Sequence, residues 1–192
     1  MQLNHFSAPS KTFLIGEYLA LSGGDTIIIN TLPTFDLHIS SCSQFNLQNI
    51  HPDSPAGKLI FDHKSKLEKL SIEFIDPHQG RGGFGASSAQ FLLALQLITA
   101  QQGQPYSVSK DNFLILLEQY QHYAQYKQGI KPSGADIIAQ ATGLITLFNR
   151  NQQQLESQPW PFEQLGLLLF KTPIKLATHE HLANIKALDT SE

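Results

Sequence analysis

Residues 80–91 read Gly-Arg-Gly-Gly-Phe-Gly-Ala-Ser-Ser-Ala-Gln-Phe, a glycine-rich turn that runs directly into an apolar helix. Glycine adopts positive φ freely and lets the backbone approach a ligand closely. The free N–H groups at the start of the helix then point at an anion, supported by the helix dipole. Three glycines supply the turn and two serines open the helix: Gly82, Gly83, Gly85, Ser87 and Ser88. The stretch is typical of a phosphate-binding loop, although a glycine cluster before a helix is in other proteins simply a loop.

The composition is that of an ordinary soluble protein. The 192 residues can hold one domain with a solid core, or one domain and part of a second. With 13 Lys and Arg against 16 Asp and Glu the net charge is −3, which disfavours a nucleic-acid or membrane surface. The single Cys42 excludes an internal disulfide and a multi-cysteine metal site. No stretch has membrane-spanning length and the N-terminus lacks a signal pattern, so we expect a cytoplasmic protein.

The first half of the chain is predicted to consist mainly of strands. Residues 6–17 indicate a loop followed by a short buried strand at Thr12–Ile15. Residues 41–58 are rich in Ser, Asn, Pro and Gly, which predicts an exposed loop. Lys64–Lys69 is expected to form a helical turn or a loop. β-Branched, alternating or short apolar runs indicate further strands at Thr26–Thr31, Thr34–Ser40, Leu59–Phe61 and Ser71–Ile75.

The second half is predicted to be more helical. An apolar stripe from Phe113 to Ala124 indicates a helix that Ser107 or Ser109 caps and Gly129 ends. A further helix is expected from a Ser133 cap to Gly143. Leu144–Phe148 and Leu165–Phe170 are predicted strands, and the polar stretch Asn149–Pro161 is predicted to be a loop or a domain boundary. Strands, then helices, then strands again favour an α+β fold.

Four segments together resemble the GHMP kinases, the superfamily of galactokinase, homoserine kinase, mevalonate kinase and phosphomevalonate kinase. Ser7–Gly24 resembles the first signature of that superfamily, and Gly83–Ala89 resembles its phosphate-binding second signature. Pro132-Ser-Gly-Ala-Asp136 is similar to the segment that carries the catalytic aspartate. Lys171–Thr178 is similar to a strand and turn that contact the substrate. The order and the spacing of the segments also fit.

The resemblance implies an α+β fold whose N-terminal domain is of the ribosomal protein S5 domain 2 type. Residues 1–160 would form the ATP-binding domain, and residues 161–192 would begin an incomplete C-terminal domain. Glu17 would either lie near the nucleotide or form a structural ion pair. The implied triphosphate-binding residues are Gly83, Gly85, Ala86, Ser87 and Ser88, with Ser87 also beside Mg²⁺.

The resemblance also implies that Asp136 faces the acceptor hydroxyl, with Lys11 beside it. A carboxylate in hydrogen-bond reach of an alcohol can accept its proton, and a nearby ammonium stabilises the developing negative charge. Most of the remaining catalysis in phosphoryl transfer is positioning and charge neutralisation. Without the resemblance, Asp136 could simply be a carboxylate favoured in the first turn of its helix, and Lys11 a solvated lysine. The implied substrate-contacting residues are Lys11, Tyr18, Ser133 and Thr178.

The chain departs from the family pattern at several positions. Gln125 stands where mevalonate kinases usually have a glutamate that binds Mg²⁺, so we expect weaker metal binding there. Tyr18 replaces a histidine and looks more like phosphomevalonate kinase, and Ala86 replaces the first serine of the usual pair. A third glycine-rich signature is absent after Gly166. A missing second domain would expose an apolar face, so we expect a homodimer or another partner to cover it.

Two functions follow as hypotheses. The first is an ATP- and Mg²⁺-dependent kinase of a small metabolite, with mevalonate or phosphomevalonate as the favoured acceptor. The second is a kinase-like module that binds a nucleotide or a protein partner without turnover, which Gln125 and the absent third signature support. Binding of RNA is disfavoured by the net negative charge and by the lack of a basic stripe.

Overall fold

The computed structural model describes residues 5–104, 106–124 and 132–169. The chain divides into two compact units, Met1–Pro161 and Phe162–Glu192. The division lies close to the predicted domain boundary, and the assignment of the second unit to a C-terminal kinase domain stays a prediction. Residues 165–169 pair with no strand in the described part of the chain, so the strand predicted from Leu165 is wrong over its described residues. An apolar run becomes a strand only where a neighbouring strand takes up its backbone hydrogen bonds.

A six-stranded sheet forms the base of the first unit. Its central strand β2 carries β1 along one edge and β4 and β5 along the other, and all of these pairs are antiparallel. β3 pairs with β4 in parallel, and β6 pairs with β5 antiparallel. The strands are β1 (His5–Ile15), β2 (Thr26–Ser41), β3 (Asn46–Gln48), β4 (Leu70–Ile75), β5 (Ile145–Asn149) and β6 (Gln154–Gln158).

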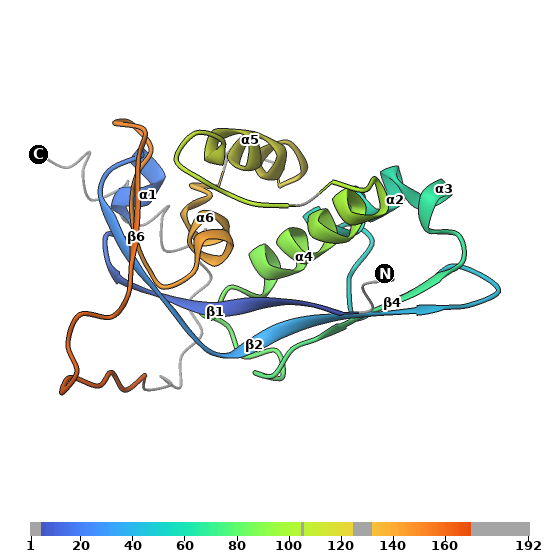
Figure 1. Ribbon diagram of the computed structural model, residues 1–192, viewed down its shortest axis with the longest axis horizontal. Coiled ribbons are helices and arrows are strands. Elements are labelled where there is room, and N and C mark those ends of the chain that lie inside the picture. The colour runs from blue at the N-terminus through green and yellow to red at the C-terminus, as the bar shows by residue number, and fades with distance from the viewer. Residues whose placement is uncertain (1–4, 105, 125–131, 170–192) are drawn as a thin grey trace, which may run out of the picture. The chain divides into compact units, whose positions relative to one another are not determined.

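Four of the helices lie together on one side of the sheet (Figure 1). α4 and α6 contact the strands β1 and β2 directly, and α2 and α5 pack against these two helices. α1 and α3 are single turns. The helices are α1 (Leu19–Ser22), α2 (Pro55–Asp62), α3 (Lys64–Leu67), α4 (Ala86–Gln101), α5 (Phe113–Tyr123) and α6 (Ala135–Thr142).

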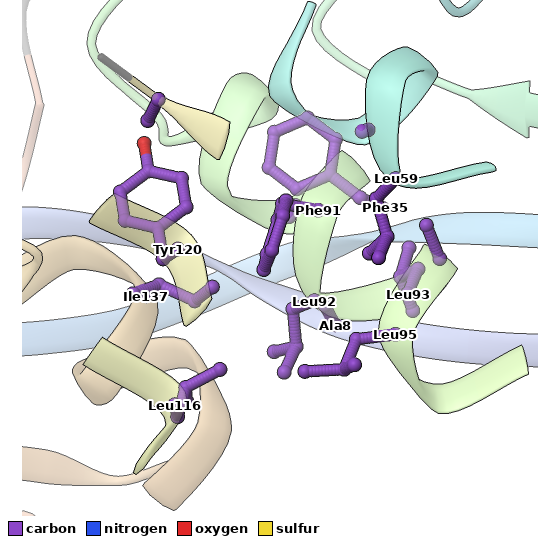
Figure 2. Packing of buried hydrophobic residues seen from close by; sticks show 14 of the residues in the cluster. Ala8, Phe35, Leu59, Phe91, Leu92, Leu93, Leu95, Leu116, Tyr120 and Ile137 are labelled. Carbon is purple, nitrogen blue, oxygen red and sulfur yellow. The ribbon is translucent and has the colours of Figure 1, made fainter. Parts of the chain in front are cut away.

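The core is built around α4, which packs on the sheet and against α2 and α6. Figure 2 shows Phe91 and Leu92 of α4 among side chains from α5, α6 and the strands. Phe91 meets the ring of Tyr120 edge-on at 5.2 Å between centroids. Because most of α4 is apolar on every side, the helix can be buried all round, which fixes the position of its N-terminus.

Several predicted elements differ from the structure. Leu59–Phe61 lies in α2, which Ser54 caps by accepting a hydrogen bond from the Gly57 N–H, rather than in a strand. A short apolar run does not by itself distinguish a strand from a buried helix. The loop predicted at the start of residues 6–17 is part of β1. The loop predicted at residues 41–58 contains β3 and the start of α2, and the stretch 149–161, predicted as a loop or a domain boundary, contains β6.

Other boundaries also shift. The two strands predicted around Pro33 form the single strand β2. Asn112, not Ser107 or Ser109, is the N-cap residue of α5, and the predicted terminator Gly129 lies outside the described residues. The strands at Ser71–Ile75 and Leu144–Phe148 are confirmed to within a residue, as is the end of α6 at Gly143.

Candidate functional site

The glycine-rich loop ends in an open helix start. α4 begins at Ala86 with Gly85 as its N-cap residue, in the left-handed region at φ +86°, and no side chain caps it. Its first-turn N–H groups are therefore available to an anion. A Cβ built on Gly83, at φ +98°, would meet nothing within 4 Å, so the backbone there faces open space. Ser87 is exposed beside it. The start of α4 is thus an uncapped helix N-terminus beside an exposed glycine-rich loop, and its predicted role in phosphate binding stays a prediction.

Strand β1 holds the loop in place. The Lys11 N–H donates to the Phe84 carbonyl oxygen at 3.0 Å. The ring of Phe84 stacks on His78 at 3.9 Å between centroids, and His78 Nε2 lies 2.6 Å from Ser10 Oγ. Since the Ser10 hydroxyl donates to the Pro33 carbonyl, His78 Nε2 is the donor in its contact with Ser10. The sequence did not single out Ser10 or His78, because their contacts join strands and loops far apart along the chain.

Lys11 and Asp136 form an ion pair next to this loop. Lys11 Nζ lies 3.1 Å from Asp136 Oδ2, with side chains that are 7% and 35% exposed. Lys11 Nζ also lies 4.5 Å from the centroid of the Phe13 ring. A Cβ on Gly85 would stand 2.9 Å from Lys11 Cγ, so the pair and the loop are direct neighbours. The structure therefore brings together the two residues predicted to be catalytic, with the carboxylate still open to solvent.

A glycine places Asp136 in the first turn of α6. Gly134 is the N-cap residue at φ +75°, and a Cβ there would come within 2.1 Å of Leu117 Cδ1. Ser133, predicted to cap the helix and to contact substrate, is buried, and its hydroxyl accepts a hydrogen bond from the Ala135 N–H at 3.3 Å. The close contact with α5 explains the glycine, and the helix N-terminus favours the carboxylate of Asp136.

Ser88 and Gln140 form a buried hydrogen-bonded pair. The Ser88 hydroxyl is within 2.6 Å of Gln140 Oε1 and 3.0 Å of the Gly85 carbonyl oxygen. Because both contacts lie inside the protein, Ser88 could meet a phosphate only through its backbone N–H. Gln140 was not predicted, although it lies one helical turn after Asp136, on the same face of α6. That spacing is the sequence signal from which Gln140 could have been predicted.

The remaining predicted residues lie at the edge of the site or outside the described chain. Glu17 and Tyr18 are both exposed in the turn that leads into α1. No ion pair among the described residues involves Glu17, so its structural role is not supported there. Gln125 and Thr178 lie outside the described residues. Their predicted roles, like those of the loop residues, stay predictions.

The described residues fit a nucleotide phosphate better than a metal held by the protein alone. The uncapped start of α4 and the open backbone at Gly83 suit a phosphate group. No cluster of three or more His, Cys, Asp and Glu that could hold a metal ion occurs within residues 5–104, 106–124 and 132–169. Magnesium that acts on phosphate groups is usually held by one or two carboxylates together with the substrate phosphates. We therefore assign no step to a protein-bound metal.

Neither a family model nor the sequence of a curated protein matches the chain. Solved structures do match. The L. major mevalonate kinase in complex with R-mevalonate is 18% identical, with a TM-score of 0.60 over 98% of this chain and 62% of its own. The Streptococcus pneumoniae phosphomevalonate kinase in complex with phosphomevalonate and AMPPNP is 17% identical, with a TM-score of 0.57 over 77% of this chain and 51% of that enzyme. The Lactococcus lactis galactokinase complexed with galactose is 13% identical, with a TM-score of 0.63 over 81% of this chain and 47% of that enzyme.

The chain has the fold of the GHMP kinases. It spans 47–62% of the length of these three enzymes and corresponds to their N-terminal portion. The predicted α+β fold class is confirmed, and the signatures that indicated it lie in β1, at the start of α4 and at the start of α6. At these identities the matches establish the GHMP kinase fold alone. In the part of the chain that the structure describes, no helix is both long and apolar enough to cross a membrane.

Proposed function

We propose that this chain is an ATP-dependent kinase of the GHMP type that transfers the γ-phosphoryl group of ATP to a small metabolite. One observation carries the proposal. The Lys11–Asp136 pair, at 3.1 Å, adjoins the uncapped N-terminus of α4 through the contact of Lys11 with Gly85. A carboxylate, an ammonium and a phosphate-binding helix start are the groups that transfer to a hydroxyl requires.

Each group has a separate task in the proposed reaction. ATP supplies the phosphoryl group, and the backbone N–H groups of Gly83–Ser88 bind its phosphates. Asp136, with its carboxylate partly open to solvent, accepts the proton of the acceptor hydroxyl as the bond to phosphorus forms. Lys11, held by the Phe13 ring and by Asp136, stabilises the negative charge that develops on the transferred group.

For the acceptor we propose mevalonate or phosphomevalonate. Two of the matching structures are a mevalonate kinase in complex with R-mevalonate and a phosphomevalonate kinase in complex with phosphomevalonate. Mevalonate presents a hydroxyl, which needs a base such as Asp136. Phosphomevalonate presents a phosphate that is already nucleophilic, so Asp136 would then position the acceptor rather than take its proton.

The test is ADP release by the purified chain with MgATP, offering mevalonate and phosphomevalonate in parallel. Acceptor-dependent release that disappears in Asp136→Ala would support the proposal and name the substrate. The matched control is Asp111→Ala, which removes an exposed carboxylate in the turn before α5. If the chain binds ATP but releases no ADP with either acceptor, the kinase proposal for this acceptor class is wrong.

A binding module without turnover is the second candidate. Two observations favour it: the Ser88 hydroxyl is engaged with Gln140, and Gln125 stands at the position of a metal-binding glutamate. Such a module would bind ATP and form no ADP. The predicted partner over an apolar face also stays a prediction, although Leu14, Ile15 and Leu19 are exposed around the end of β1.

A further inference from the structure

Gln140 is a buried amide with every polar group engaged. Gln140 is 3% exposed and lies on α6 one turn after Asp136. Nε2 donates to the Pro9 carbonyl oxygen at 2.8 Å and to that of Gly85 at 3.2 Å. Oε1 accepts from Ser88 Oγ at 2.6 Å. A buried amide is costly unless its donors and acceptor are satisfied, and here they are.

The three partners of Gln140 belong to the separate pieces of the candidate site. Gly85 is the last residue of the glycine-rich loop, and Ser88 lies in the first turn of α4. Pro9 lies in β1 where the register with β2 shifts, between Ala8 and Ser10. A strand residue at such an irregularity lacks its regular ladder partner, so the amide of Gln140 supplies a donor that the sheet does not.

The same elements carry the ion pair. Lys11 follows Pro9 by two residues on β1, and Asp136 precedes Gln140 by one turn on α6. A Cβ on Gly85 would meet Gln140 Nε2 at 3.0 Å as well as Lys11 Cγ at 2.9 Å. One side chain therefore links α6 to β1 and to the loop, at the level where Lys11 meets Asp136.

We propose that Gln140 is a positioning residue that sets the separation between the phosphate-binding loop and the Lys11–Asp136 pair. It touches neither ATP nor acceptor, and acts by holding Gly85 and Ser88 against β1. An apolar side chain of similar volume would fill the same space and leave the loop without this link. The expected effect on ATP binding rests on the proposed function, whereas the expected effect on hydrogen exchange in the loop does not.

The experiment compares Gln140→Leu with Gln90→Leu. Gln90 is the matched control because it lies on α4 and also donates through Nε2 to a backbone carbonyl, that of Asn49, at 3.1 Å. Hydrogen exchange of the amides of residues 80–91 is measured without nucleotide, and ATP affinity is measured by calorimetry. We expect Gln140→Leu to speed exchange in the loop and to weaken ATP binding, each by about tenfold, because at least one hydrogen bond to the loop is lost. Gln90→Leu should leave both the exchange rates and the ATP affinity within about twofold of the wild type. A twofold change corresponds to less free energy than one hydrogen bond typically contributes.

Gln140→Glu separates positioning from stability. It keeps the length of the side chain but turns an ionised carboxylate towards two carbonyl oxygens, so ATP binding should be weaker than in Gln140→Leu. Protonation restores a donor, and the affinity of this variant should recover as the pH falls, beyond any change in the wild type. Because protonation would also restore folding stability, the affinity is compared only at pH values where circular dichroism shows that the variant is folded.

The outcomes are distinct. If Gln140→Leu folds and matches Gln90→Leu in loop exchange and ATP affinity, the inference is wrong. If Gln140→Leu does not fold, Gln140→Met takes its place, since this unbranched side chain of similar length also removes the amide, and unchanged loop exchange in that variant overturns the inference. If the wild-type chain binds no ATP, the proposed function fails instead, and the exchange measurement alone decides the role of Gln140.

Discussion

Replacing Gly85 by alanine tests whether the loop, Lys11 and Gln140 are packed as closely as the structure shows. Gly85 has φ +86°, where alanine costs about 1 kcal/mol relative to glycine. The added Cβ would also lie 2.9 Å from Lys11 Cγ and 3.0 Å from Gln140 Nε2. Both side chains are buried and hydrogen-bonded or ion-paired, so neither can move freely aside.

The magnitude follows from adding the two effects. Overpacking of a close-packed interior typically costs about 1–3 kcal/mol, so the free energy of unfolding should fall by about 2–4 kcal/mol in Gly85→Ala. Gly103→Ala is the matched control, because Gly103 also has positive φ, at +72°, but a Cβ there meets nothing within 4 Å. The control should lose only about 1 kcal/mol, from the backbone alone.

Urea denaturation followed by circular dichroism measures both variants, and ATP titration follows the site. We expect Gly85→Ala to weaken ATP binding while Gly103→Ala does not. Gly83→Ala adds a third comparison, because its Cβ would meet no protein atom but would stand in the space assigned to a phosphate. Equal stability of Gly85→Ala and Gly103→Ala would show that the loop does not lie against Lys11 and Gln140.

Three further variants test the site and the core. Asp136→Ala should lower turnover by about a hundredfold or more while ATP affinity stays within a few fold, as steady-state kinetics and calorimetry can show; retained turnover would mean that Asp136 is not the base. Lys11→Met should fill the space of the buried stem but lower kcat, and unchanged kcat would exclude a charge-stabilising role. Tyr106→Phe should raise the free energy of unfolding by about 1 kcal/mol, because the Tyr106 hydroxyl is buried without a hydrogen-bond partner among the described residues. Burial raises the pKa of Tyr106 above its ordinary value of 10.0. Above about pH 10 the folded state thus keeps a proton that the unfolded state releases. The free energy of unfolding of the wild type should therefore fall as the pH rises above about 10, and that of Tyr106→Phe should fall less.

The parts of the candidate site that depend on a local sequence pattern could be predicted from the sequence. The glycines before α4, and the Ser-Gly before Asp136, mark a helix start whatever the rest of the fold does. The resemblance to the GHMP kinases then paired Lys11 with Asp136, which the ion pair at 3.1 Å confirms as a contact. It could not show that the Ser88 hydroxyl points inward, because that depends on where Gln140 lies.

The errors have a common physical cause. Leu59–Phe61 was predicted as a strand from its apolar run, but the Ser54 cap and the packing of α2 on α4 make it a helix. The segment after residue 6 was predicted as a loop, but pairing with β2 makes it strand from His5 onward. In each case the decision came from a partner far away in sequence, which no local window contains.

The sequence by itself determined two parts of the candidate site: a glycine-rich helix start and a carboxylate in the first turn of a helix. Local backbone preferences and helix-end chemistry suffice for these, since they act within a few residues. Only the tertiary structure decided how the pieces meet. Pro9, Gly85, Ser88 and Gln140 are brought together by strand pairing and by the burial of α4 and α6 on the sheet, and such contacts depend on the whole fold.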